Sequence, residues 1–366
     1  MGGGPVGASL VHALRDLRVA LIGTPADPND SAASFDPRVY ALSPGNVEFL
    51  RHLGVWQKLP AERLAAVHGM RIFGDDGHAT LEFDAYEAGV PELAWIVEDG
   101  ALQRALWSGL PGEARQCERL EIGAAARLTL SDGSDVAAKL IVGADGAHSF
   151  VRRAAGIQAA ERDYGQAAVV ANFRCAKPHR NVAYQWFQGG PVLALLPLPG
   201  EQVSMVWSLP VAEAERIAAQ PAIEVTQASH RVLGELALAS AVKTFPLRRL
   251  SARRLVAPRI ALAGDAAHVV HPLAGQGLNL GLRDARVLAE TLAQRGAWRD
   301  CGDYTLLRRY ERARKEDVLA MQLTTDGLQK LFMNDAVLLS GARNFGLVLA
   351  DRLPFFKSFL VHHAVA

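Results

Sequence analysis

Glycine residues with a characteristic spacing stand near the start of the chain. Gly2, Gly4 and Gly7 fit the pattern G-x-G-x-x-G. In that pattern the glycines permit a tight turn, let a pyrophosphate approach the backbone, and let the following helix pack closely on a sheet. The start of the helix would add N–H donors and the positive end of its dipole. The pattern alone is weak evidence, because a flexible glycine-rich segment is the alternative interpretation.

An aspartate followed by glycine comes after a second predicted element. Residues 139–142 are expected to form a short buried strand, and Asp145 and Gly146 follow it. A carboxylate at this place can accept hydrogen bonds from a ribose or from backbone N–H groups, and the glycine permits close approach. The alternative is an ordinary Asp-Gly turn, which the dipeptide alone favours.

The strongest stretch covers residues 264–279, which follow a predicted buried strand at 259–263 and lead into a helix. Asp265 lies at the carboxyl end of that strand, where open α/β sheets bind ligands. Gly275 and Gly277 expose the backbone at the start of the helix, which suits a planar acceptor or an anion. Chance is a poor explanation for the whole string.

Two histidines in this stretch raise the question of a metal. The spacing of His268 and His271 is tolerable for a ligand pair, but no nearby carboxylate or cysteine completes the set. We therefore expect no metal site and interpret both as loop histidines that hydrogen-bond the backbone.

The glycine pattern at the start requires a strand, a turn, a helix and a second strand. Apolar spacing predicts the helix over residues 8–17, and β-forming residues predict the second strand over 18–22. The first strand is expected before Gly2, where only Met1 stands. The second strand ends at Gly23 instead of the acid that holds the ribose of an adenosine. The nearest acids, in the loop that follows, are Asp27 and Asp30.

The rest of the chain changes character twice. Pro44 after Ser43 predicts a helix start, and another helix is expected at about residues 100–106. Short apolar stretches separated by Gly and Pro then predict an antiparallel sheet; they are residues 169–173, 182–187, 192–196 and 203–207. From about Gly277 the chain is expected to be mostly helical. The α/β pattern is thus interrupted, which predicts one domain in pieces separated by pieces of another.

Composition excludes several classes of protein. Of 366 residues, 50% are hydrophobic and 21% are charged, unlike a disordered or fibrous chain. Lys and Arg number 39 and Asp and Glu 38, a formal net charge of +1, so we expect no nucleic-acid partner. The 3 cysteines lack CxxC spacing, which favours a reducing, cytoplasmic setting over disulfides. No apolar run approaches the roughly 20 residues that span a bilayer.

Taken together, these stretches resemble the FAD-dependent aromatic hydroxylases (single-component flavoprotein monooxygenases), and among them the ubiquinone-biosynthesis branch. The resemblance extends over nearly the whole chain. Its further segments are residues 36–43, Gln103 within 99–106, residues 190–198, residues 206–208 and residues 343–347.

That resemblance implies an α/β fold: a Rossmann-like FAD-binding domain of the p-hydroxybenzoate-hydroxylase type, an inserted antiparallel-sheet substrate domain, and a helical C-terminal arm. The FAD-binding domain would be discontinuous, over residues 1–65, 95–165 and 250–325, and without its first strand. The substrate domain would comprise residues 66–94 and 166–249, and the helical C-terminal segment residues 326–366.

The resemblance also implies how FAD is held. Gly2, Gly4 and Gly7 would cradle the pyrophosphate, and Arg38 would neutralise phosphate charge near the ribityl chain. Gln103 would hydrogen-bond the ribityl or flavin region. Without the family, Arg38 would equally be a solvated loop cation and Gln103 a surface residue.

Both aspartate motifs acquire roles in the same way. Asp145 and Gly146 would serve FAD and the NADPH route, and Gly264 and Asp265 would bind the ribityl chain. The residues implied to line the isoalloxazine ring are Pro272, Gly275, Gln276, Gly277, Leu278 and Asn279.

The implied activity is cofactor chemistry. NADPH or NADH reduces FAD, O2 adds at flavin C4a, and the resulting hydroperoxide hydroxylates the ring of a prenylated phenol. The protein supplies orientation, electrostatics and exclusion of water. No single side chain stands out as a catalytic base. Aromatic residues of the antiparallel block suit a hydrophobic substrate and suit a plain sheet core equally well; they are Tyr184, Trp186, Phe187 and Trp207.

Two other functions stay open. One is a non-catalytic or flavin-poor scaffold subunit of the quinone-biosynthesis assembly, and the other is a soluble hydroxylase of a small phenolic compound. The C-terminal segment mixes apolar residues with Arg343, Arg352 and Lys357. A membrane surface or other quinone-biosynthesis proteins are therefore expected partners, for a cytoplasmic protein that is peripheral at the inner face of the membrane.

Overall fold

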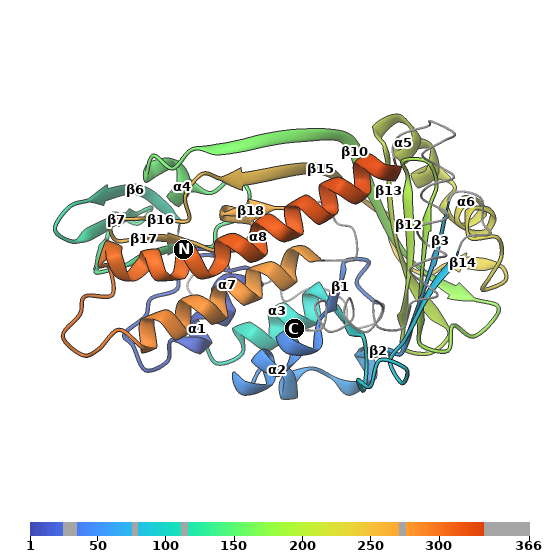
Figure 1. Ribbon diagram of the computed structural model, residues 1–366, viewed down its shortest axis with the longest axis horizontal. Helices are drawn as coiled ribbons and strands as arrows, with labels where there is room; N and C mark the ends of the chain where they lie inside the picture. Colours follow the sequence, from blue (N-terminus) through green and yellow to red (C-terminus); the bar gives the residue numbers. More distant parts are fainter. Residues whose placement is uncertain (25–34, 75–79, 111–115, 271–275, 333–366) are drawn as a thin grey trace.

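A large sheet lies at one end of the molecule, and small sheets and helices lie at the other (Figure 1). The computed structural model describes residues 1–24, 35–74, 80–110, 116–270 and 276–332. The predictions for Asp27, Asp30, His271, Pro272 and Gly275 lie outside the described residues. So does most of the C-terminal segment, from residue 333 onward.

Two short parallel strands form the centre of the small-sheet end. β9 (Ile141–Gly143) and β17 (Ile260–Leu262) pair in parallel, and β16 (Val256–Ala257) pairs antiparallel with β17. The residues of β17 have no exposed surface, as expected for a parallel strand covered on both faces. The strands predicted at 139–142 and 259–263 are confirmed.

Helices cover these strands. α1 (Pro5–Ala13) packs on α7 (Gln276–Ala293), and α7 packs on α8 (Tyr304–Phe332). In Figure 1 α7 and α8 run side by side from the small sheets toward the large one. The helical character predicted from Gly277 onward is confirmed for the described residues. The first helix starts and ends earlier than the predicted 8–17, because Pro5 suits the first helical position after Gly4.

The strand predicted at residues 18–22 is wrong. Gly2 donates a hydrogen bond from its backbone N–H to the Ile22 carbonyl at 2.7 Å. Met1 lies on the other side beside β9, with its amine 2.9 Å from the Val142 carbonyl. Among the described residues, the backbone of Gly2 is therefore the neighbour of this segment, and it bonds the segment only at its last residue, Ile22. Residues 18–20 are exposed, and in the described part of the chain they have no partner strand.

The chain has further small elements outside the large sheet. α2 (Pro44–His52) begins after Ser43 as predicted, and α3 (Asp99–Trp107) covers the predicted 100–106. β1 (Val39–Leu42), β5 (Ala94–Glu98) and β2 (Ala65–Val67) form one three-stranded sheet. The remaining elements here are β6 (Cys117–Ile122), β7 (Ala126–Leu130), β8 (Asp135–Ala138), α4 (Phe150–Ala154), and the short 3-10 helices Trp56–Lys58, Ala61–Arg63 and η3 (Gly264–Ala266).

The large sheet has nine strands and confirms the antiparallel sheet predicted for residues 168–208. Its strands are β18 (His268–Val269), β15 (Lys243–Ala252), β10 (Ala159–Cys175), β13 (Gln202–Pro210), β12 (Val192–Leu198), β11 (Val182–Phe187), β3 (Gly69–Phe73) and β4 (Thr80–Asp84), with β14 (Leu236–Leu238) paired to β10. Neighbours are antiparallel except β11 and β3. β10 and β15 reach back to the small-sheet end, while α5 (Val211–Ala219) and α6 (Pro221–Ala228) cover the far face (Figure 1).

A buried carboxylate joins the elements that end near the predicted site. Asp284 of α7 has no exposed surface. One oxygen, Oδ2, lies 2.7 Å from His268 Nε2 and accepts from the Gly264 N–H at 2.8 Å. The other, Oδ1, accepts from Nε of the buried Arg314 on α8 at 2.7 Å. One side chain thus holds the end of β17, β18 and both long helices. The expectation of a loop histidine bonded to the backbone is wrong for His268, which lies in β18 and bonds the Asp284 carboxylate.

The charge state of Asp284 makes this junction sensitive to acid. Burial alone would raise the pKa of Asp284, but His268 and Arg314 outweigh it and hold that pKa below its ordinary value. A carboxyl with a lowered folded-state pKa stabilises the fold above the pH at which the unfolded chain titrates, about 4. That stabilisation is lost as the pH falls through the lower folded-state pKa.

We predict that Asp284→Asn lowers the free energy of unfolding by about 3–5 kcal/mol at pH 7, because it leaves Arg314 buried without its charged partner. Urea unfolding measures the loss. The control is Asp317→Asn, which removes the exposed partner of the same guanidinium and should cost less than about 1 kcal/mol. The difference between Asp284→Asn and the parent should shrink at low pH. Equal losses in the two variants would show that the buried pair does not hold this junction.

Candidate functional site

The three glycines at the start meet different surroundings. Gly2 has φ of +106°, and a methyl group there would lie 2.1 Å from the Ala144 carbonyl oxygen. A methyl group on Gly7 would lie 2.0 Å from the Gly2 carbonyl oxygen. Gly4 precedes the first turn of α1, and a methyl group there would meet no atom within 4 Å. Packing therefore requires Gly2 and Gly7, whereas Gly4 leaves open space at a helix N-terminus.

Asp145 forms a local cap. Its Oδ1 accepts from Ser149 Oγ at 2.5 Å and its Oδ2 accepts from the Val151 N–H at 3.1 Å, so both oxygens bind the start of α4. Gly146 has φ of +79°, a left-handed conformation that favours glycine. The Asp-Gly turn considered from the sequence is thus present.

Arg152 connects the two aspartate motifs. Its buried guanidinium donates to the Ala147 carbonyl at 2.8 Å and to the Ala266 carbonyl at 2.9 Å. Gly264, with φ of +61°, brings the second motif against Val6 of α1. These contacts place the loops after the parallel strands β9 and β17 beside the glycine turn.

Asp265 is the carboxylate that the protein leaves free. Its side chain is exposed and forms no hydrogen bond with another described residue. Even so, the surrounding protein raises the pKa of Asp265 above its ordinary value, against the charges of His268, Arg38 and Arg248. An exposed carboxyl group without a hydrogen bond to another described residue can accept hydrogen bonds from a ligand.

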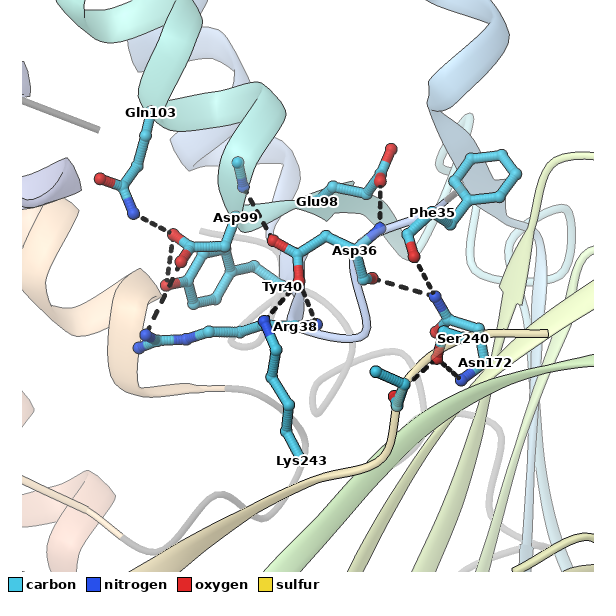
Figure 2. Close-up of polar contacts among 12 residues, drawn as sticks. Phe35, Asp36, Arg38, Tyr40, Glu98, Asp99, Gln103, Asn172, Ser240 and Lys243 are labelled. Carbon is cyan, nitrogen blue, oxygen red and sulfur yellow. Dashed lines mark hydrogen bonds and ion pairs between the residues drawn. The ribbon is translucent and has the colours of Figure 1, made fainter. Parts of the chain in front are cut away.

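Figure 2 shows the polar contacts around Arg38. Its guanidinium lies 3.6 Å from the Asp99 carboxylate, and it is half-exposed. Tyr40 Oη and Gln103 Nε2 donate to Asp99 Oδ1 at 3.0 and 2.9 Å. Arg38 also lies over the rings of Tyr40 and Phe245, at 5.6 and 5.8 Å from the centroids. Gln103 and Arg38 are therefore held by the same carboxylate, one that sequence reasoning did not single out.

Asp36 binds this cluster to the large sheet. Its Oδ1 accepts from the Arg38 N–H at 2.9 Å and lies 3.7 Å from Lys243 Nζ of β15. Asn172 of β10 donates from Nδ2 to the Phe35 and Asp36 carbonyls at 2.9 and 3.0 Å (Figure 2). The available sequence signal was that Asp36 stands two residues before Arg38.

Asn279 holds α7 in place through its side chain. Oδ1 accepts from the Ser43 N–H at 3.0 Å and from Asn46 Nδ2 at 2.9 Å, and Nδ2 donates to the Ala41 carbonyl at 2.8 Å. Only its backbone is left for a ligand. Gly277 and Leu278 are half-buried next to it, Gln276 begins α7, and Pro272 and Gly275 lie outside the described residues.

Arg248 and Arg153, which the sequence did not single out, both contact His148. Arg248 of β15 lies with Nη2 2.6 Å from His148 Nε2. Arg153 donates to the His148 carbonyl. The charge of Arg248 also acts to lower the pKa of Asp265, against the larger effect of burial, which raises it. Arginine side chains so placed can bind the phosphates of a second ligand.

The aromatic residues of the large sheet lie mainly on one face. Tyr184, Trp186 and Trp207 belong to the cluster that α5 and α6 cover, with Phe73 stacked on Trp186. Phe187 lies outside that cluster, against Val192. The sequence left open whether these aromatic residues line a substrate pocket or form the core of a sheet. Tyr184, Trp186 and Trp207 belong to the core.

Other possible sites are few. The described residues contain no group of His, Cys, Asp and Glu side chains that could hold a metal ion. None of the described helices combines the length and the apolar character needed to cross a membrane. A recess of about 430 Å³ beside α5 and α6 contains the Arg216–Glu224 ion pair, and its lining includes none of the residues predicted to bind FAD.

Solved structures share this fold. HpxO of Klebsiella pneumoniae, complexed with FAD and uric acid, matches with a TM-score of 0.77 at 19% identity, over 98% of this chain and 95% of that one. PqsL of Pseudomonas aeruginosa, a probable FAD-dependent monooxygenase, matches with a TM-score of 0.77 at 23% identity, over 94% and 98%. The predicted α/β fold class is confirmed.

Sequence comparisons show the family. A model described as "FAD binding domain" matches residues 1–324. Ubiquinone hydroxylase UbiL of Rhodospirillum rubrum is 34% identical over 100% of this chain and 88% of its own length. The 3-demethoxyubiquinol 3-hydroxylase of Escherichia coli is 32% identical over 100% of this chain and 97% of its own. The chain belongs to the family of FAD-dependent monooxygenases that includes the hydroxylases of ubiquinone biosynthesis.

Proposed function

We propose that this chain hydroxylates the aromatic ring of a prenylated phenol in ubiquinone biosynthesis, with FAD as cofactor, NADPH or NADH as reductant and O2 as co-substrate. The observation that carries the proposal is the free carboxylate of Asp265, which follows Gly264 where that residue packs against Val6 of α1, the helix with an open start at Gly4. The names of the relatives supply the substrate class.

The residues fit FAD in three ways. The N–H groups at the start of α1 would receive the pyrophosphate at Gly4, with Gly2 and Gly7 keeping the turn tight. Asp265 would accept from ribityl hydroxyls. Arg38, oriented by Asp99, would neutralise phosphate charge, with Gln103 donating nearby.

Several residues predicted to bind FAD would act indirectly. Asp145 and Gly146 would shape the loop after β9, and the Asn279 side chain would fix the start of α7. Backbone N–H groups of Gln276, Gly277 and Leu278 would face the isoalloxazine ring, together with Pro272 and Gly275 from outside the described residues. Gly264 would set the angle at which Asp265 leaves its strand.

A separate cationic group would receive the reductant. Arg248 and Arg153 both contact His148, and the charge of Arg248 acts on Asp265. The pyrophosphate of NADPH or NADH is an anion that such a group attracts.

Bound FAD would supply the reduction of O2 and the transfer of one oxygen atom to the ring. The protein's own part is to bind the ring, orient it and exclude water. The divided domain arrangement proposed from the sequence suits this task, since residues 66–94 and 166–249 would supply the substrate side and the remainder the FAD side.

We predict that changes at the open positions weaken FAD binding without harming the fold. Gly4→Ala and Asp265→Asn should each raise the Kd for FAD by roughly tenfold or more, while the apoproteins melt no lower than the parent. Asp265→Asn removes a carboxyl whose raised pKa makes its ionised form unfavourable in the folded state at pH 7.

Gly7→Ala is the contrasting control and should lower the melting temperature, because its methyl group meets the Gly2 carbonyl. Flavin fluorescence and thermal melts measure both. Unchanged FAD affinity in Gly4→Ala and Asp265→Asn would contradict the proposal that these two residues bind FAD.

We predict that the purified chain binds FAD at about one per chain and consumes NADPH or NADH when a prenylated phenol is added. Absorbance spectra and product analysis by mass spectrometry follow both steps. A short phenolic acid such as 4-hydroxybenzoate should give little product. The reverse preference would indicate a hydroxylase of small phenols, and a folded chain that takes up no FAD would indicate a scaffold subunit.

We also infer that the C-terminal segment, residues 326–366, brings the chain to a membrane surface that holds the substrate. Its support is the mixture of apolar residues with Arg343, Arg352 and Lys357. The full chain should float with vesicles of phosphatidylglycerol and phosphatidylcholine but not with phosphatidylcholine alone. Arg352→Glu combined with Lys357→Glu should reduce flotation. Absence of the parent from the anionic vesicle fraction would refute a membrane role and favour partner proteins.

A further inference from the structure

The face of the large sheet opposite α5 and α6 has a composition of its own. Side chains alternate along each strand, so residues between those packed under α5 and α6 point to the other side. We call this other side the inner face. The register aligns its residues in two rows: Lys243, Val170, Val206, Ala194 and Gln185 in one, and Phe245, Ala168, Ser208, Val192 and Phe187 in the next.

Small side chains at the centre of the inner face are incompletely covered. Val206 and Ala194 are half-buried, although each lies on an interior strand of the sheet. Their neighbours on the opposite face, Met205 and Leu193, have no exposed surface. The described residues therefore leave the inner face open over Val206 and Ala194.

The inner face also borders the FAD side of the molecule. Lys243 and Phe245, at one end of the two rows, contact Asp36 and Arg38. A third row, which contains Asn172 and Ser204, is closed against the segment at Phe35 and Asp36. The open part of the inner face thus begins where the Arg38 cluster ends.

Two polar side chains interrupt the apolar surface of the open part. Gln185 is 6% exposed and Ser208 is 4% exposed. Neither side chain forms a hydrogen bond with any described residue, unlike Lys243, which pairs with Asp36. They flank Val206 and Ala194, and their strands are two apart in the sheet, roughly 10 Å.

The polar atoms of Gln185 and Ser208 are not among the fully enclosed, unpartnered side-chain atoms of the described residues, so they keep contact with the open part of the inner face. A ligand or water there can supply their hydrogen bonds. Ligand sites commonly consist of apolar walls with a few polar groups that fix the orientation of the ligand. Gln185 can donate and accept, and Ser208 can do both, so either suits a hydroxyl or methoxyl oxygen on an aromatic ring.

We propose that Gln185, assisted by Ser208, binds an oxygen substituent of the substrate ring and so orients the ring for hydroxylation. This inference rests on the proposed function, since it takes a phenol as the ligand. Gln185 acts as a positioning residue: it selects the ring by its oxygen, while the apolar side chains around it receive the hydrocarbon.

The test compares Gln185→Met with the parent, both loaded with FAD. Methionine keeps the length and unbranched shape of glutamine and removes the amide. Calorimetric titration with 2-prenylphenol should give a Kd about tenfold higher in Gln185→Met, whereas prenylbenzene, which lacks the ring oxygen, should bind both proteins equally. The ratio of hydroxylated product to NADPH consumed should also fall in Gln185→Met.

Two controls separate this role from packing and from failure of the proposed function. Gln227→Met, on the exposed side of α6, should match the parent in every measurement. Equal losses of phenol and prenylbenzene affinity in Gln185→Met, or no loss for either, would overturn the inference. A parent that binds 2-prenylphenol without hydroxylating any prenylated phenol would overturn the proposed function, and the Kd comparison would still decide the role of Gln185.

Discussion

The candidate site depends on one buried carboxylate. Asp284 binds the backbone where β17 ends, the His268 side chain of β18, and Arg314 on α8. Short parallel strands have few ladder hydrogen bonds, so their ends are poorly held by the sheet itself. A fully paired ionic group inside the protein compensates for this, because each partner would be left with an uncompensated charge or dipole if the arrangement shifted. The contacts of Asp284 with Gly264 and His268 hold the backbone on both sides of Asp265.

A second buried ion extends this rigidity to the neighbouring strand. Arg152 donates to carbonyls of both loops, the one after β9 and the one after β17. Asp145 is used locally, as the cap of α4, and Asn279 is used between α7 and the start of α2. The side chains of Asp145 and Asn279, which the sequence predicted to bind FAD, therefore bind other parts of the protein. The groups that remain accessible are backbone N–H groups, Asp265 and Arg38.

The large sheet separates stability from recognition by the alternation of its side chains. One face carries Tyr184, Trp186 and Trp207 and is sealed by α5 and α6. The other carries small residues at its centre and faces the Arg38 cluster, where Asp36 pairs with Lys243 of the sheet. Large side chains on the sealed face supply burial, and small ones on the inner face leave room. Both functions are met by the same strands because neighbouring residues point in opposite directions.

The sequence by itself determined the elements and the family. Pro44 after Ser43 placed a helix start, apolar runs placed β9, β17 and the antiparallel strands, and glycine spacing placed the turn before α1. These are local signals, since propensity and periodicity act over a few residues. The prediction of a strand at residues 18–22 is wrong because a strand also requires a partner. Among the described residues, Gly2 bonds this segment only at Ile22. Tertiary structure alone decided that Asp265 stays free, that Asp284 and Arg314 meet, and that Trp207 and Gln185 face opposite sides. Such outcomes depend on which distant side chains arrive at the same place, and pairings between residues far apart in the chain leave no trace in local spacing.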